Sequence, residues 1–282
     1  MVLESLVDPA IAKKKPYEVF FFGVVSATIG LFLSYWVFRQ YSSLIMVFLI
    51  TLATVPLLYF TMRSEEEADV ELPTETSIMQ EHGRVLFFLL ILFFGITLSL
   101  SFWYVVLPKE MVNVLFSSQS QTILQINNQI SGNAVHFNLV LRIFLNNIRV
   151  LIFSLLFSLL YGMGAIFILA WNATVIAAAI GNFIRSNLAA YASTAGLGQA
   201  SVYFSVLSLG ILRYAIHGIP EILAYFVGGL AGGIISMAII NHDIFNEKRE
   251  RIMLDSAELV LLAIGLLFGA ALVEVYVTPL LF

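Results

Sequence analysis

The chain has 282 residues, of which 60% are hydrophobic and only 11% charged, with a formal net charge of −4. Soluble domains carry about 25% charged residues, so this composition and a mean hydropathy of +0.95 exclude an ordinary soluble fold. The Leu, Phe and Gly runs lack the alternation of a membrane β-barrel. We therefore predict an all-α, polytopic transmembrane helix bundle. Cysteine is absent, which excludes disulfides and thiolate metal sites.

Apolar stretches predict about seven spans, since a span needs about 20 residues. They lie roughly at residues 17–38, 42–62, 85–107, 150–171, 173–187, 219–240 and 256–278. The first is too long for a signal-peptide core, so we interpret it as a span. The stretch 201–216 is short for a span, and we predict a re-entrant or interfacial helix there. Asn172 is expected to break the chain between the fourth and fifth spans.

Three regions follow from this pattern. Residues 1–63 form an N-terminal two-span hairpin, 64–84 an acidic cytoplasmic loop, and 85–282 the main membrane domain. The loop reads either as a solvated linker or as an acidic docking or cation-binding segment. Within the main domain, 108–145 is expected to be an outer amphipathic region, because its Gln, Asn and Ser residues alternate with apolar ones. It is the best candidate for a partner-facing surface.

Basic residues near the span ends predict the orientation. They favour a multi-pass protein of the cell membrane, with the N-terminus in the cytoplasm and the C-terminus outside. This arrangement requires that 201–216 does not cross the bilayer.

Ionisable side chains gather at the start of the sixth span. Arg213, His217 and Glu221 recur at four-residue spacing, and Gly218 and Pro220 predict a helix break just before Glu221. Charged groups at membrane depth are costly and usually have a partner or a task. The residues are compatible with a charge-satisfying Arg–Glu pair or with a binding or proton-handling site. One His and one Glu fall short of the ligands that zinc requires.

Four further residues are candidates for this polar intramembrane cluster: Asn146, Asn147, Arg149 and Glu274. The first three read either as interfacial residues that cap a helix and reach water, or as members of the cluster. Glu274 either reaches water or pairs with a basic residue. We expect Glu221 to be paired inside the protein with Arg213 or Arg149, because an isolated buried carboxylate costs several kcal/mol.

Glycines follow in the same span. Gly228 and Gly232 are four residues apart, as are Gly229 and Gly233, which predicts a close helix–helix contact. The sequence leaves open whether the neighbour lies in the same chain or across a dimer. No GxSxG, HExxH, P-loop or GxGxxG motif occurs in a suitable context, so we expect neither an enzyme nor a cofactor. Without a basic patch, nucleic-acid binding is not supported.

From about residue 85 onward, several short motifs occur in order. They are Asn146-Asn147, Gly162-Met163-Gly164, Trp171-Asn172-Ala173, His217-Gly218-Ile219-Pro220-Glu221, the glycines of 228–233, and Ala270-Ala271-Leu272-Val273-Glu274 with Thr278-Pro279. In these residues the chain resembles the stage II sporulation protein M family. The resemblance implies an integral membrane protein with no assigned catalytic activity. In spore-forming bacteria the family member anchors a complex of cell-wall hydrolases.

Two functions follow as expectations. The first is a membrane scaffold in the lipid bilayer, which assembles with itself, most simply as a dimer, and with extracytoplasmic protein partners. The second is a transporter or channel for a small ion or solute, with its polar site at the broken helix around His217 and Glu221. Discontinuous helices are typical of transport sites, although the sequence shows no clear inverted repeat.

Overall fold

The computed structural model describes residues 16–71, 75–130, 136–161, 165–195, 200–240 and 249–281. Within these ranges some side chains lie outside the description, those of Arg213 and His217 among them. All the described elements are helical, as the composition predicts. They are α2 (Pro16–Val37), η1 (Arg39–Tyr41), α3 (Ser42–Glu71), α4 (Glu75–Val106), α5 (Lys109–Leu115), α6 (Ser117–Ile130), α7 (His136–Tyr161), α8 (Ala165–Ala195), α9 (Ala200–Ile240), α10 (Arg249–Leu272), the π-helix η3 (Val273–Val277) and α11 (Thr278–Leu281).

The prediction of about seven spans is confirmed. Seven of the described helical segments are long and apolar enough to cross a bilayer. They are Pro16–Val37, Arg39–Leu57, His82–Val106, Phe137–Leu159, Ile166–Leu188, Gly218–Ile240 and Glu250–Leu281. The chain is therefore a polytopic helix bundle, in which internal hydrogen bonds satisfy the backbone inside the lipid.

The predicted boundary between the fourth and fifth spans is wrong. Asn172 does not break the chain: it lies inside α8, and its amide donates to the carbonyl of Ile168 at 2.9 Å. This bond back to the preceding turn satisfies the polar side chain within the helix, so an asparagine there needs no interruption. In the structure α7 ends at Tyr161 and α8 begins at Ala165, and the Gly-Met-Gly sequence of residues 162–164 lies outside the described residues.

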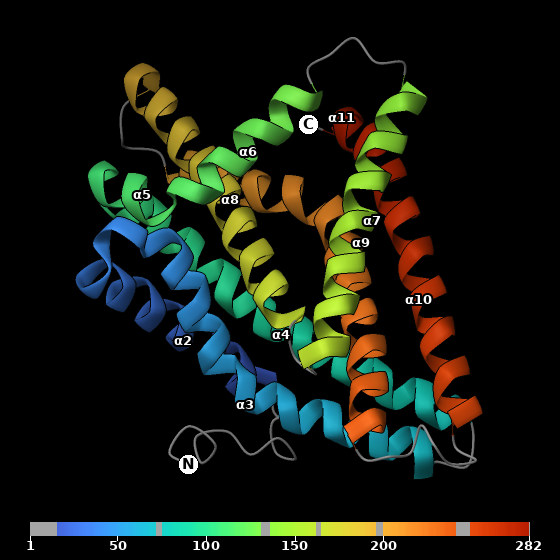
Figure 1. Cartoon of the computed structure of the whole chain (residues 1–282). Helices are drawn as coiled ribbons and strands as arrows, with labels where there is room; N and C mark the ends of the chain where they lie inside the picture. The colour runs from blue at the N-terminus through green and yellow to red at the C-terminus, as the bar shows by residue number, and fades with distance from the viewer. Residues whose placement is uncertain are drawn as a thin grey trace.

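The predicted break at residues 218–220 is also wrong. Pro220 lies inside α9, which runs unbroken for 41 residues. In Figure 1 the first part of α9 crosses beneath α6 and then turns to run beside α7 and α10. A bent helix is the usual response to an interior proline, because neighbouring helices can hold the remaining turns in place. Residues 201–216 are thus the first arm of the same helix that forms the sixth span, not a separate helix.

Two other segments are more helical than predicted. The expected loop at 64–84 is largely helix, since α3 extends to Glu71 and α4 begins at Glu75. Glutamate, glutamine and methionine favour helices, which explains why the helices continue past their apolar parts. In the expected amphipathic region 108–145, α5 and α6 are the short helices predicted, but α7 begins already at His136.

Helices pack in two main groups. On one side α2 lies along α4, and on the other α7, α9 and α10 run side by side (Figure 1). A Cβ on Gly23 would lie 2.7 Å from the carbonyl oxygen of Leu92, and one on Gly95 would touch the carbonyl of Phe20. Glycine is needed at this crossing because the backbones of α2 and α4 meet directly.

The sixth span lies at the centre of the bundle. Of the most apolar 18 residues within Gly218–Ile240, 83% are buried, compared with 22% in Phe137–Leu159 and 28% in Glu250–Leu281. Its neighbours α7, α8 and α10 surround it. A polar group on this span therefore faces protein and not lipid.

Candidate functional site

A carboxylate and a phenol form the centre of the site on α9. The hydroxyl of Tyr225 donates to Oε1 of Glu221 at 2.7 Å, one helical turn away. Tyr225 is only 1% exposed, whereas Glu221 is partly buried. A hydrogen bond to a charged acceptor contributes about 1.5–3 kcal/mol, so this pair holds the carboxylate in one orientation.

A second carboxylate comes from the end of the last span. Glu274 lies in the π-helix η3, partly buried, and close enough to Glu221 and Tyr225 to interact with both electrostatically. The contacts between η3 and α9 bring the two segments together. A π-helical turn shifts the register of the side chains that follow it and often occurs at functional sites. The site therefore contains two neighbouring carboxylates in the membrane-spanning part of the protein.

The helix α7 covers this site with a row of polar side chains. Ser154 donates to the carbonyl of Tyr225 at 3.5 Å, and Ser158 to that of Gly229 at 2.7 Å. Residue numbers rise together along the two helices, so α7 and α9 run parallel. Asn147 lies seven residues before Ser154 and so on the same face of α7. It is 5% exposed.

The helical register places Asn147 near the start of the sixth span. Gly218 lies seven residues before Tyr225, just as Asn147 lies seven residues before Ser154. Asn147 therefore lies opposite the turn from Gly218 to Glu221. Gly218 is itself buried, yet a Cβ there would meet no neighbouring atom within 4 Å. The amide of Asn147 and the carboxylate of Glu221 thus lie at a similar level of the bundle.

The other predicted members of the cluster are distributed differently. Asn146 and Arg149 are exposed. Among the described residues no ion pair joins Arg149 to Glu221, whose hydrogen-bond partner is Tyr225. The expected pairing with Arg213, and the place of His217, lie outside the described side chains.

The glycines of the sixth span contact α7 of the same chain. A Cβ on Gly228 would touch the side chain of Leu151, and one on Gly232 would lie 2.7 Å from the carbonyl oxygen of Leu155. Gly229 and Gly233 are buried too, and the carbonyl of Gly229 accepts the hydrogen bond from Ser158. The neighbour that the sequence left open is therefore within the chain.

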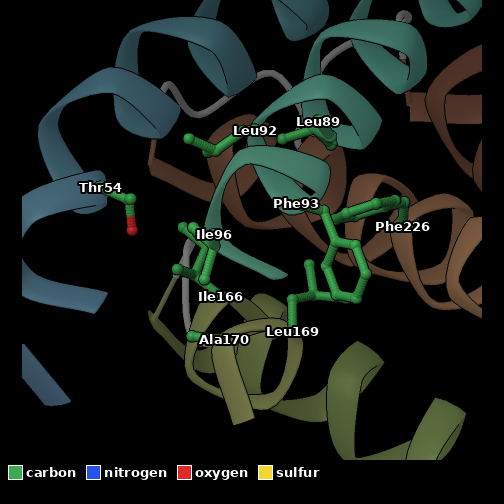
Figure 2. A pocket seen from close by; sticks show the side chains of 9 residues that line it. All are labelled: Thr54, Leu89, Leu92, Phe93, Ile96, Ile166, Leu169, Ala170 and Phe226. Carbon is green, nitrogen blue, oxygen red and sulfur yellow. The ribbon is translucent and has the colours of Figure 1, made fainter. Parts of the chain in front are cut away.

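An apolar pocket lies elsewhere in the bundle, between α3, α4, α8 and α9 (Figure 2). Its volume is about 30 Å³, enough for a water molecule. The hydroxyl of Thr54 is its only polar lining group, and it donates to the carbonyls of Ile50 and Thr51 in its own helix. Phe93 and Phe226 meet edge to face with their centroids 5.9 Å apart. The pocket offers apolar packing and no convergent polar groups.

Polar contacts also fix the amphipathic helix α6 to the bundle. The amide of Gln119 donates to the carbonyl of Ser43 at 3.2 Å and to the hydroxyl of Thr174 at 3.0 Å. Gln119 is fully buried, as are Leu115 and Phe116 before it. The hydroxyls of Ser43 and Ser118 lie 2.8 Å apart. These contacts join α6 to α3 and α8.

Sequence reasoning missed several residues of the site. The sequence spacing could have identified Tyr225, because it lies four residues after Glu221 and so on the same helix face. The sequence could not have identified Ser154 and Ser158, because serine is common in membrane helices. Only the contact with α9 gives these two serines a role here. The π-helical turn around Glu274 also had no sequence signal.

The fold and the site define a class: a multi-pass membrane protein with paired carboxylates among its packed helices. The chain belongs to the stage II sporulation protein M family, whose model matches residues 19–279. The match covers nearly the whole chain and includes the first two spans, which the resemblance from residue 85 onward had left out. No curated protein and no solved structure matches the chain.

Proposed function

We propose that this protein is a membrane scaffold that presents the helices α5 and α6 to a partner protein. The observation that carries the proposal is the way these helices are attached. Their inner residues Leu115, Phe116 and Gln119 are fully buried against the bundle. Their outer residues are open, with Leu124 61% exposed. A surface fixed at its base and open on its other side is suited to binding without a large change of shape.

The composition of the open surface supports a protein partner. The exposed residues of this region include a lysine, a glutamate, an asparagine, a glutamine and a leucine: Lys109, Glu110, Asn113, Gln121 and Leu124. Mixed polar and apolar side chains are typical of interfaces that form and dissociate. In Figure 1 these helices lie toward the end of the bundle that carries the C-terminus. The basic-residue pattern assigns that end to the outside, which makes the partner extracytoplasmic.

Self-assembly is the second part of the proposal, and it requires another surface. Gly228 and Gly232 are already packed on α7, so they do not serve a dimer contact. The lipid-facing side of α10 is a better candidate, because Leu261 is 68% exposed there. Gly265 and Gly269 lie on the same helix, and a Cβ on either would meet no neighbour within 4 Å. Small residues on an open helix face suit close packing in lipid.

Site-specific photo-crosslinking in native membranes tests the scaffold. A crosslinker at exposed Gln121 is expected to capture a defined protein, and one at exposed Glu250, at the start of α10, is the matched control. The captured protein, once purified, should bind the wild type and bind less to a variant with Lys109 and Glu110 replaced by alanine. Equal capture at both positions, or binding unaffected by those substitutions, would count against the scaffold.

Transport of a small ion is the second candidate, and the carboxylate pair of Glu221 and Glu274 favours it. Ionisable side chains within a membrane bundle mark ion pathways in many transporters. Proteoliposomes with the wild type and with Glu221→Gln would decide. A proton or sodium flux that is lost in the variant would support transport, and equal, negligible flux in both would refute it.

A further inference from the structure

The turn between the first two spans carries a group of exposed aromatic side chains. Trp36 is 83% exposed, Tyr41 63% and Phe38 46%. A single residue separates the apolar segments Pro16–Val37 and Arg39–Leu57, so the turn is too short to reach beyond the bilayer surface. Tryptophan and tyrosine are enriched at that depth, because their rings are apolar and their N–H or O–H groups are polar. The turn therefore lies at the level of the lipid headgroups.

A basic side chain lies at the centre of this turn. Arg39 is exposed, and its guanidinium carbon lies 5.1 Å from the centroid of the Tyr35 ring. A cation–π contact of this kind orients the guanidinium without neutralising its charge. Residues 19–64 contain no Asp or Glu, so neither span beside the turn supplies an acidic partner.

A second basic residue, Lys109, lies on the same membrane surface. Successive spans alternate in direction, so the third span, His82–Val106, ends on the side where the first span ends. Lys109 is exposed just after that end, at the start of α5, which packs against η1. Glu110 comes next, but adjacent residues of a helix do not face each other, so it does not neutralise Lys109. Arg185 adds positive charge nearby, where its guanidinium donates to the carbonyl of Leu107.

We propose that the turn from Trp36 to Tyr41, together with Lys109, binds the headgroups of anionic phospholipids. The guanidinium of Arg39 has the planar set of donors that matches a phosphate, and Lys109 supplies a second positive charge. The exposed aromatic side chains are placed to contact the lipid beneath the phosphate.

The exposed residues around the turn indicate that its occupant is a lipid and not a soluble molecule. On α3, Leu44 is 48% exposed and Phe48 49%, and on α2 Phe32 is 38% exposed. The aromatic turn thus continues directly into the apolar sides of two spans, which face the hydrocarbon. The excess of basic over acidic side chains among the described residues of this corner favours a lipid with net negative charge over a zwitterionic one.

The inference goes beyond the scaffold and does not require it. The helix α5 carries Lys109 and also begins the surface that we propose for a protein partner. Lipid preference is measured on the purified chain without a partner, whereas crosslinking at Gln121 tests the partner alone. The failure of either proposal therefore leaves the other standing.

Fluorescence quenching of Trp36 by brominated lipids tests the proposal. The chain has three tryptophans, so Trp103→Phe and Trp171→Phe together leave Trp36 as the single reporter. The full chain is placed in bilayers of phosphatidylglycerol and phosphatidylcholine in equal parts, with bromine on the acyl chains of one lipid at a time. We expect brominated phosphatidylglycerol to quench more strongly, with an apparent preference of about fivefold or more, since one basic residue near the surface contributes about 1 kcal/mol.

Arg39→Gln in the same background removes one charge and should lower this preference about fivefold. About 1 M NaCl should weaken the preference of the unsubstituted turn too, because the Debye length falls to about 3 Å. The matched control is Arg149→Gln, an exposed arginine on α7, which lies away from the α2–α3 turn in Figure 1 and should leave the preference unchanged.

A second measurement keeps the test decisive if the loss of two tryptophans prevents folding. The melting temperature of the chain with all its tryptophans is followed in detergent with added phosphatidylglycerol, phosphatidylcholine or soluble glycerol 3-phosphate. Only phosphatidylglycerol should raise it, and less so in Arg39→Gln, since a ligand of the native state stabilises that state.

Three results would overturn the proposal. The first is equal quenching of Trp36 by the two brominated lipids at low salt, or no quenching by either. The second is a preference or a melting response that is unchanged in Arg39→Gln. The third is a rise in melting temperature with glycerol 3-phosphate that equals the rise with the lipid, which would indicate a site for free anions.

Discussion

Replacing Gly232 by alanine is expected to force α7 and α9 apart. The new Cβ would lie 2.7 Å from the carbonyl oxygen of Leu155 and 2.9 Å from Cβ of Ser158. Ordinary van der Waals contact begins near 3.4 Å, so the helices must separate by about 0.7 Å, which forfeits a quarter to a half of the local dispersion energy. Overpacking of this kind costs about 1–3 kcal/mol. Alanine recovers about 1 kcal/mol through its higher helix propensity, so we expect a net loss of up to about 2 kcal/mol.

Gly83, exposed on α4, supplies the matched control, because a Cβ at that position would meet no neighbour within 4 Å. Gly83→Ala should therefore keep or raise stability through helix propensity alone. Reversible unfolding of both variants in mixed micelles, followed by circular dichroism as the SDS fraction rises, gives the two free energies. If Gly232→Ala unfolds at the same SDS fraction as Gly83→Ala, the contact between α7 and α9 is looser than the structure indicates.

Substitutions at three further residues test the polar contacts. Tyr225→Phe removes the hydrogen bond to Glu221 and should cost about 1.5–3 kcal/mol in the same unfolding assay, and an unchanged midpoint would mean that the bond contributes nothing. Glu221→Ala should destabilise more than Glu221→Gln, because glutamine keeps the shape and can still accept from the phenol; the reverse order in melting temperature would contradict this. Arg185→Met removes the guanidinium donor to the carbonyls of Tyr104 (3.3 Å) and Leu107 (3.2 Å), where α4 ends. It should cost about 1 kcal/mol, and faster hydrogen exchange of the amides at the end of α4 would locate the effect.

Local sequence signals were reliable for the number of spans and unreliable for where helices break. The apolar stretches gave the seven spans because hydrocarbon excludes polar residues over a fixed thickness. Asn172 and Pro220 both read as breaks, yet both lie inside helices. The side chain of Asn172 donates a hydrogen bond to a carbonyl in its own helix, and packing against neighbouring helices accommodates the bend at Pro220. A residue that disfavours a helix locally does not end it where contacts with the surrounding helices offset the local cost.

For the candidate site, too, the sequence predicted the residues but not their partners. Sequence spacing marked Glu221 and Glu274 as charged groups within apolar segments, but it predicted basic partners for them. In the structure the two carboxylates are neighbours, and Tyr225 is the hydrogen-bond partner of Glu221. The distance in sequence between the sixth and seventh spans conceals this, because the pairing depends on how α9 and η3 pack.

By itself the sequence determined the membrane class, the number of spans, the family and the presence of costly charges at membrane depth. Each of these depends on composition or local order, because transfer of a residue into lipid is a property of that residue and its near neighbours. The tertiary structure alone decided that the glycines of α9 meet α7, that Asn147 is buried, and that two carboxylates share one site. These features join segments far apart in the chain, and in lipid such contacts are selected by shape and hydrogen bonding, not by hydrophobicity.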